Sequence, residues 1–291
     1  NGFPTKIYPV ISEFNYLIVQ AKINGKDYFL DATDKYLSFG EIPFRCLNDY
    51  GRLLDFKNGS EWIDLKPNKP SNVLYKAELK MDDNNTISGS INSKRTGYHA
   101  LKHRKSYYQN SNQYIDNLEN NSPSIEISDF EITNGGKTNS NFEEAYNIEY
   151  NYENAGDNIY LNPFFIKFFN ENPFKLQERT YPIDFGYKDT YFYSFNLKLN
   201  DNYTLAEMPK DDVFNLPNKT GQVFFSTKFF NNSVNVTFKI SFRKSVYEYE
   251  YYPYLKDFMS KIVNIQKNSI ILLKKKWKIF CYIWYNEEFL W

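Results

Sequence analysis

A carboxylate and a phenol near the start of the chain have the spacing to meet across a β-hairpin. Asn24-Gly25 separates two runs rich in β-branched and aromatic residues, and this dipeptide is a strong signal for a two-residue type I′ turn. Counting outward from the turn places Tyr16 diagonally opposite Asp31 on one face. Diagonal neighbours are roughly 7–8 Å apart, within reach of a long side chain. The sequence therefore predicts a contact between Tyr16 and Asp31.

Asp31 begins the motif Asp31-Ala32-Thr33, and with its hairpin it resembles the transglutaminase-like superfamily, specifically the C-terminal part of bacterial proteins carrying the domains DUF3857 and DUF3858. In the enzymes of that superfamily, the resemblance implies a His on the first strand, the triad Asp in such a motif, and a nucleophilic Cys upstream. Tyr16 occupies the His position here, and the Cys position would lie before residue 1. A phenol with a pKa near ~10 is a poor general base at neutral pH, unlike an imidazole near ~6.5. The resemblance thus implies the fold and argues against the reaction.

Motifs in the second half resemble the closing DUF3858 module of the same proteins. They are the run at 179–187, Leu216-Pro217-Asn218, Tyr252-Pro253 and the end of the following apolar segment at 271–275. Because such proteins carry an export signal far upstream, the resemblance implies a periplasmic or cell-envelope location. It also implies protein or glycan partners in the envelope.

Asp31 and Cys46 each have a catalytic and a structural interpretation. In an active relative, Asp31 would orient the imidazole and stabilise its protonated form. In this chain we expect a buried strand-end carboxylate that accepts hydrogen bonds from Tyr16 or a backbone amide. Arg45 beside Cys46 could lower the pKa of that thiol, but Cys46 follows Asp31, whereas the superfamily nucleophile precedes it. We therefore expect a buried structural cysteine.

His99 and His103 are the only histidines, and their i, i+4 spacing suits half of a two-His zinc site. The residues between them include no glutamate, and Arg104 with Lys105 would repel a cation. We expect a solvated helix face, no metal site and no cofactor. Glycine-rich phosphate loops, G-x-S-x-G elbows and paired-carboxylate motifs are absent from the sequence.

Composition excludes several classes of protein. The chain has 291 residues, 42% of them hydrophobic, which is enough for two domains with a core each. Lys plus Arg and Asp plus Glu both total 35, so no net charge favours nucleic acid. No apolar run reaches the ~20 residues of a transmembrane helix. Cys46 and Cys281, the only cysteines, form no disulfide framework. The chain opens with Asn1 and shows no signal pattern, so we expect a fragment or a processed chain.

We expect a mainly β, α+β fold in three parts. Residues 1–66 form the C-terminal part of a transglutaminase-like domain, and residues 67–275 form a DUF3858-like antiparallel β-sandwich module with one or two helices. A further division near residue 155 is left open. Residues 276–291 form an aromatic tail that could meet a membrane interface or cover an edge strand. The individual elements are predicted as follows: strands at 61–65, 73–81, 86–93, 125–132, 146–152, 160–169, 190–199, 223–230 and 233–245, and helices at 97–118 and 255–273.

Two functional hypotheses follow. The first is a non-catalytic envelope protein whose transglutaminase-like remnant is a scaffold and whose β-rich module contacts a protein or a glycan. The second is a fragment of a cysteine-dependent transglutaminase or peptidase-like enzyme acting on peptide amides. In it, Asp31 orients a base, and the nucleophile lies outside this chain.

Overall fold

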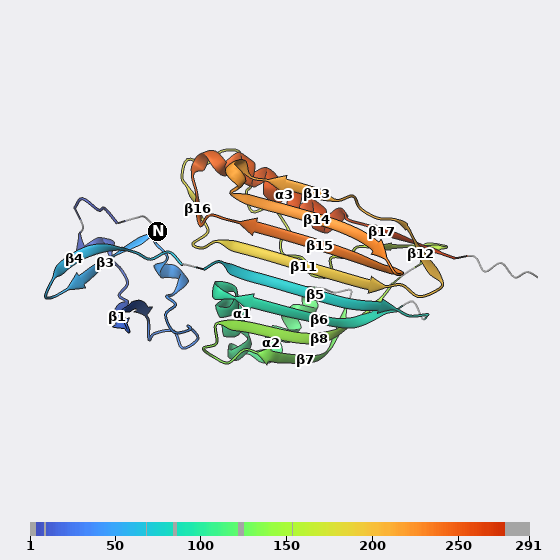
Figure 1. The fold of residues 1–291 in the computed structure, drawn as a ribbon, viewed down its shortest axis with the longest axis horizontal. Coiled ribbons are helices and arrows are strands. Elements are labelled where there is room, and N and C mark those ends of the chain that lie inside the picture. Colours follow the sequence, from blue (N-terminus) through green and yellow to red (C-terminus); the bar gives the residue numbers. More distant parts are fainter. Residues whose placement is uncertain are drawn as a thin grey trace, which may run out of the picture.

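The computed structural model describes residues 4–8, 10–67, 69–83, 86–121, 125–152 and 154–276, and it shows a small N-terminal unit at one end of a large sheet (Figure 1). The N-terminal unit contains two antiparallel hairpins, β1 with β2 and β3 with β4. Its elements are the 3₁₀ helices η1 (Ile11–Glu13) and η2 (Phe44–Cys46) and the strands β1 (Val19–Ile23), β2 (Lys26–Leu30), β3 (Tyr50–Asp55) and β4 (Gly59–Asp64).

Eight strands form one mixed sheet in the order β13-β14-β15-β11-β5-β6-β8-β7. Only β5 and β11 pair in parallel, and every other neighbouring pair is antiparallel. Strands from both sides of residue 155 therefore share this sheet. The bounds are β5 (Ser71–Met81), β6 (Thr86–Thr96), β7 (Glu126–Asn134), β8 (Asn141–Asn151), β11 (Asp189–Lys198), β13 (Asp212–Asn215), β14 (Gly221–Phe230) and β15 (Ser233–Phe242).

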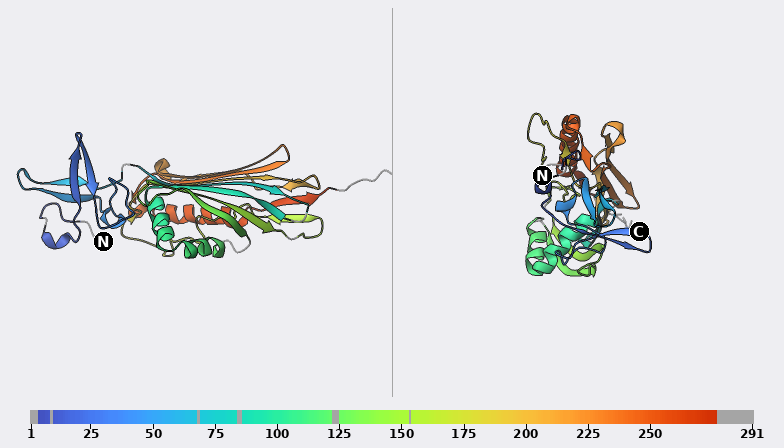
Figure 2. Two further views of the ribbon diagram at one scale, coloured as in Figure 1. Left: turned by 90° about the horizontal axis from the view of Figure 1, so that it is seen from below. Right: turned by 90° about the vertical axis from the view of Figure 1, so that its left-hand side faces the viewer.

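Helices cover one face of the large sheet and leave the other open (Figure 2). They are α1 (Gly97–Gln109), α2 (Ser111–Asn120) and α3 (Tyr252–Asn268). A three-stranded sheet packs on the helix-covered side, since its buried side chains belong to the same core as those of the large sheet. The remaining elements are β9 (Asn158–Leu161), β10 (Ile183–Asp184), β12 (Tyr203–Glu207), β16 (Val246–Tyr247) and β17 (Ile271–Lys275), with the 3₁₀ helices η3 (Pro217–Lys219) and η4 (Tyr249–Tyr251).

Strict alternation of apolar and polar residues produces the main core. Along β5, Val73, Tyr75 and Ala77 are buried, while the residues between them face the open side. On α3, Leu255, Phe258 and other apolar residues are buried against this face of the sheet. The buried apolar side chains of the strands, which recur at every second residue, and those on one side of α3 therefore form a single core layer.

A buried polar network holds α2 against the large sheet. Arg95 on β6 and Glu144 on β8 form an ion pair of 2.8 Å with side chains at most 1% exposed. Tyr75 accepts a hydrogen bond from Arg95, and the Tyr114 hydroxyl on α2 donates to Glu144 Oε2 at 2.7 Å. Burial opposes the charge of Arg95, but Glu144, Tyr75 and Tyr114 together outweigh this effect and raise the pKa of the guanidinium. The guanidinium is therefore charged, and it donates hydrogen bonds to Glu144, Ser93 and Tyr75.

The mainly β, α+β class is confirmed, and several predicted details are wrong. The large sheet is mixed, and the second layer is α3 with a small sheet rather than the second sheet of a complete sandwich. There are three α-helices among the described residues. The predicted helix 97–118 is two helices, because Asn110 breaks it and its side chain caps α2 by accepting from the Gln113 amide at 3.1 Å.

Two further boundaries differ from prediction. The predicted strand 160–169 ends at Leu161, since the Asn162 side chain accepts from the Phe164 amide at 2.9 Å in a turn that includes Pro163. The predicted helix 255–273 ends at Asn268, and its last apolar residues form β17 instead. The aromatic tail lies outside the described residues from position 277 onward.

We predict that Glu144→Ala lowers the free energy of unfolding by about 3–5 kcal/mol, because it leaves Arg95 charged and unpaired in the interior. Urea unfolding measures the change. Glu143→Ala is the matched control, because Glu143 lies next to Glu144 on the opposite face of the sheet. It pairs with Lys94 at 2.7 Å, and the side chains of Glu143 and Lys94 are 25% and 48% exposed. A surface pair of this kind contributes about 1 kcal/mol or less. Equal effects of the two variants would contradict the network's role.

Candidate functional site

The first hairpin has the predicted register. Ile23 pairs with Lys26, and both turn residues, Asn24 and Gly25, have positive φ angles of 51° and 77°, as a type I′ turn requires. Tyr16 precedes β1, and Asp31 follows β2. The Tyr16 hydroxyl donates to Asp31 Oδ2 at 2.5 Å, so the predicted contact is confirmed.

Thr33 and Arg45 complete the cluster around Asp31. The Thr33 amide donates to Asp31 Oδ1 at 2.7 Å, and the Thr33 hydroxyl lies 2.7 Å from the phenol oxygen of Tyr16. Arg45 Nη2 donates to the same phenol oxygen at 2.5 Å, with the guanidinium 4.3 Å from the centre of the Tyr16 ring. The sequence associates Arg45 only with its neighbour Cys46. Its place above Tyr16 depends on η2, which no sequence signal predicted.

The electrostatics of the cluster favour an ionised, hydrogen-bonded carboxylate. Burial acts to raise the pKa of Asp31, but hydrogen bonds from Tyr16 and Thr33 and the charge of Arg45 together hold it below its ordinary value. The hydrogen bond to Tyr16 raises the pKa of Arg45. The phenol proton is directed to Asp31, and the phenol oxygen accepts from Arg45. The cluster is thus a closed set of hydrogen bonds with no imidazole in it.

Cys46 is the buried structural cysteine that the sequence predicted. Burial raises the pKa of the thiol to about 11; Arg45 opposes this effect in part, and Asp31 adds to it. At neutral pH the thiol is therefore protonated and a weak nucleophile. Cys281 lies outside the described residues.

A cavity of about 610 Å³ lies between the two hairpins of the N-terminal unit and is bordered by Tyr16, Arg45 and Cys46. Its remaining lining is largely apolar, and Leu17, Leu54 and Phe56 are exposed around it. No sequence pattern predicts this cavity, since β3 is not among the expected strands. The volume lies within the range of small-molecule sites, which is ≈ 300–1,000 Å³. The cluster therefore adjoins a hollow suited to binding.

The two histidines have separate partners, so the prediction of a solvated helix face is wrong. His99 Nε2 lies 2.7 Å from Asp189 Oδ1 at the start of β11, with both side chains 13% exposed. His103 Nδ1 lies 2.9 Å from the Tyr114 hydroxyl. Within the described parts of the chain, no three His, Cys, Asp or Glu side chains gather as metal ligands.

The hydrogen bonds of His103 define its protonated nitrogen. The Tyr114 hydroxyl donates its only proton to Glu144, so it accepts from His103, and Nδ1 is the donor. Burial, with the charges of Arg95 and Lys102, holds the pKa of His103 well below 6.5. The imidazole is therefore neutral at physiological pH and serves as a structural donor.

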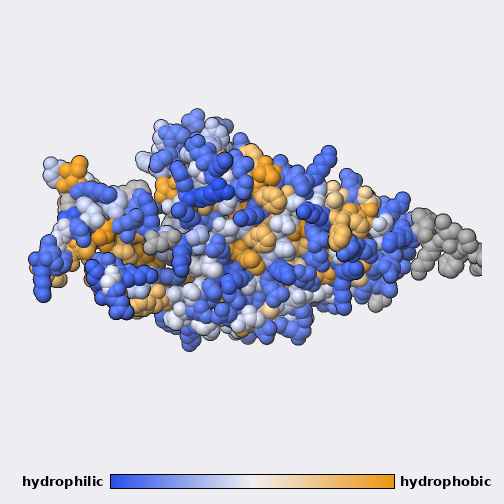
Figure 3. Space-filling model, in the orientation of Figure 1, coloured by the Kyte–Doolittle hydropathy of each residue, from blue (hydrophilic) through white to orange (hydrophobic). Residues whose placement is uncertain are grey.

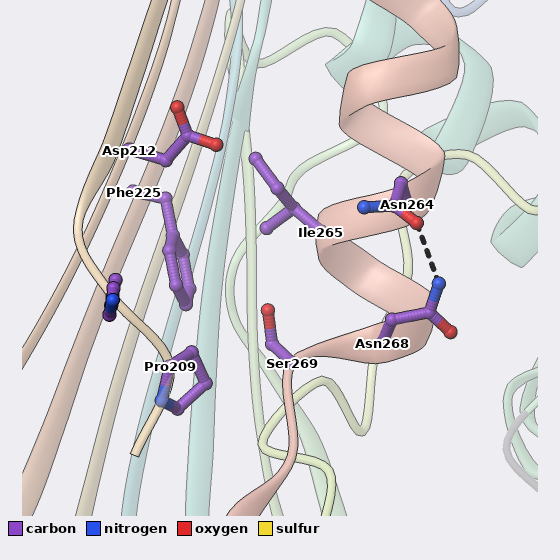
Figure 4. A pocket seen from close by; sticks show the side chains of 8 residues that line it. Pro209, Asp212, Phe225, Asn264, Ile265, Asn268 and Ser269 are labelled. Carbon is purple, nitrogen blue, oxygen red and sulfur yellow. Dashed lines mark hydrogen bonds between the residues drawn. The ribbon is translucent and has the colours of Figure 1, made fainter.

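A second, smaller cavity of about 140 Å³ lies between the β13–β14 edge and the end of α3 (Figure 4). Asn268 donates to Asn264 at 2.6 Å across its rim, and Asp212 pairs with Lys261 at 2.5 Å. It is too small for most ligands, given the range for small-molecule sites. We assign no function to it.

Comparisons with known proteins agree with part of the predicted resemblance. Residues 157–272 match the family described as "Domain of Unknown Function with solved-structure structure (DUF3858)". The matched span runs from the strand β9 region into β17 and includes β11, β13, β14, β15 and α3. No curated protein and no solved structure matches the chain. Of the helices described, none has the length and apolar character to cross a membrane.

We predict that Tyr16→Phe raises the pKa of Asp31, because it removes the phenol hydrogen bond that favours the ionised carboxylate. An NMR titration of the Asp side-chain carboxyl carbons measures the change. Asp55 is an internal control, since Lys57 and Asn58 rather than Tyr16 lower its pKa. An unchanged Asp31 titration would show that Tyr16 does not govern this carboxylate.

We also predict that folding stability falls as the pH drops below about 6.5, in part through His103. The unfolded chain then binds a proton at His103 that the folded state does not, and this term approaches about 1.4 kcal/mol per pH unit. In His103→Asn, which keeps a donor toward Tyr114, the free energy of unfolding should depend less on pH between pH 7.5 and 5.5. Identical slopes would assign the acid sensitivity to other groups.

Proposed function

We propose that this protein is a non-catalytic binding protein of the cell envelope, in which a transglutaminase-like remnant serves as a scaffold for a β-rich contact module. One observation carries the proposal: Tyr16, which the resemblance places at the position of the general base, is held as a hydrogen-bond donor to Asp31. A phenol in this state has no basic site to accept a proton from a nucleophile.

The surroundings of Asp31 support the same conclusion. The nearest thiol, Cys46, is buried and protonated. Arg45 further satisfies the phenol oxygen, so a proton transfer through Tyr16 would have to break a charged hydrogen bond. The observed hydrogen bonds therefore stabilise the hairpin and its loop without offering an acid–base pair.

The envelope location and the binding role rest on the resemblance, together with two surface features. One is the apolar cavity beside Tyr16. The other is the open face of the large sheet, which no described helix or strand covers (Figure 2). A rigid eight-stranded sheet with a free face suits contact with a partner better than it suits chemistry.

We predict that the protein fails to incorporate amine-donor probes into acyl substrates and that iodoacetamide labels Cys46 slowly, because its thiolate is scarce at neutral pH. Mass spectrometry maps any modified residue. Asp31→Ala is the diagnostic variant, since a triad Asp is required for acyl transfer and a structural one is not. Amine incorporation that Asp31→Ala abolishes would overturn the proposal and favour a cysteine-dependent enzyme.

A further inference from the structure

A row of apolar side chains crosses the open face of the large sheet at one level. The register places Phe192 of β11 and Phe224 of β14 opposite the same residue, Lys239 of β15. Leu74 of β5 continues the row beyond Phe192, and Val213 of β13 continues it beyond Phe224. We call these five residues the cross-strand row. Figure 3 shows hydrophobic surface running across the middle of this face.

The side chains of the row are accessible. Leu74 is 38% exposed, Phe224 36% and Val213 52%, although each is a residue that a sheet normally buries. The two phenylalanines are two strands apart, roughly 10 Å across the sheet. The row is therefore long and narrow, one side chain wide, and it runs perpendicular to the strands.

Both flanks of the row carry uncharged hydrogen-bonding groups. On one side, Thr190, Ser241 and Gln222 are in register across β11, β15 and β14. On the other side, the same three strands contribute a second register row, which consists of Ser194, Thr237 and Ser226. Ser241 and Ser226 are buried, and the Ser226 hydroxyl donates to Asp211 Oδ2 at 3.0 Å. The partly exposed hydrogen-bonding groups that border the apolar centre are therefore those of Thr190, Gln222, Ser194 and Thr237.

Lys239 is the one charged residue in the cross-strand row. It is exposed, and among the described residues it forms no ion pair, whereas Lys94, three strands away on β6, pairs with Glu143 at 2.7 Å. The register places Lys239 between Phe192 and Phe224, and its side chain is exposed on the open face. A single cation at the centre of an apolar row favours a polymer that carries one anionic group for every few of its monomers.

We propose that the cross-strand row binds a linear polysaccharide that carries carboxylates. The C–H faces of its sugar rings pack on Phe192, Phe224, Leu74 and Val213, its hydroxyls bond to the flanking Ser, Thr and Gln residues, and a carboxylate meets Lys239. This inference deepens the proposed function, because it names the partner of the β-rich module.

Other polymers fit this face less well. A stable protein interface buries about 800 Å² per partner, and its apolar centre is depleted of Lys and Ser. The cross-strand row is one residue wide, it contains a Lys, and Ser residues lie beside it. Nucleic acid needs many cations along its path, and the row has one. A chain of sugar rings matches an apolar strip with polar borders.

Native affinity electrophoresis of the full chain in gels containing polygalacturonate tests the proposal, with dextran as the uncharged polymer. Polygalacturonate should retard the protein and dextran should not. Lys239→Gln and Phe192→Ser should each weaken binding by about tenfold or more, as expected for the loss of a charged hydrogen bond or an apolar contact. Lys80→Gln is the matched control: it removes an equal charge from β5, at an exposed position two residues beyond Glu78 on the same face.

Absence of binding to polygalacturonate, or equal binding by all three variants, would overturn the assignment. Equal retardation by dextran, with no effect of Lys239→Gln, would overturn the role of the cation. Circular dichroism checks that each variant is folded. The residues tested are remote from Asp31, so failure here leaves the non-catalytic proposal to its own amine-incorporation assay.

Discussion

The parallel pairing of β5 with β11 is the constraint on which the rest of the molecule depends. It joins two antiparallel groups of strands through residues that are more than 100 positions apart in sequence, since Ser71 pairs with Asp189 at one end and Lys80 with Lys198 at the other. Because parallel pairing carries no hairpin connection, only long-range packing can establish it. Once formed, it makes the buried faces of both groups one continuous surface, which α3 and the small sheet then cover.

The same junction positions the N-terminal unit. Tyr98 at the start of α1 and Tyr187 just before β11 stack with ring centres 4.9 Å apart, and Phe44 packs edge-on against both. Gly186 allows this contact, since a Cβ there would lie 2.6 Å from the Phe44 ring. Phe44 precedes Arg45 in η2, so the aromatic contact that attaches the unit to the sheet also sets the guanidinium above Tyr16. The Asp31 cluster is therefore tied to the β5–β11 junction through one turn of 3₁₀ helix.

The sequence was informative where interactions are local. Asn24-Gly25 fixed the first register, and with it the Tyr16–Asp31 contact, because a two-residue turn allows only one pairing. Most large-sheet strands followed from alternation, as in β5. The position of Arg45 and the cavity beside it could not be predicted, because they depend on η2 and β3, for which no sequence signal was found. The cross-strand row could not be predicted because it depends on which distant strands are neighbours. Apolar residues at 271–273 fitted a helix as well as a strand, and only pairing with β9 and β12 decided between them.

Under the proposed function, the Tyr16–Asp31 pair keeps the structure of a triad-like site without a base. An imidazole at this position would donate one N–H to the carboxylate and keep a second nitrogen free to accept a proton. The phenol donates to Asp31 equally well, but its oxygen is then committed to Arg45 and Thr33. The carboxylate remains ionised and bonded in either case, so the hairpin and its loop lose little stability. Under the proposed function, selection acts on the scaffold that this carboxylate organises, and a donor at position 16 is sufficient for that purpose.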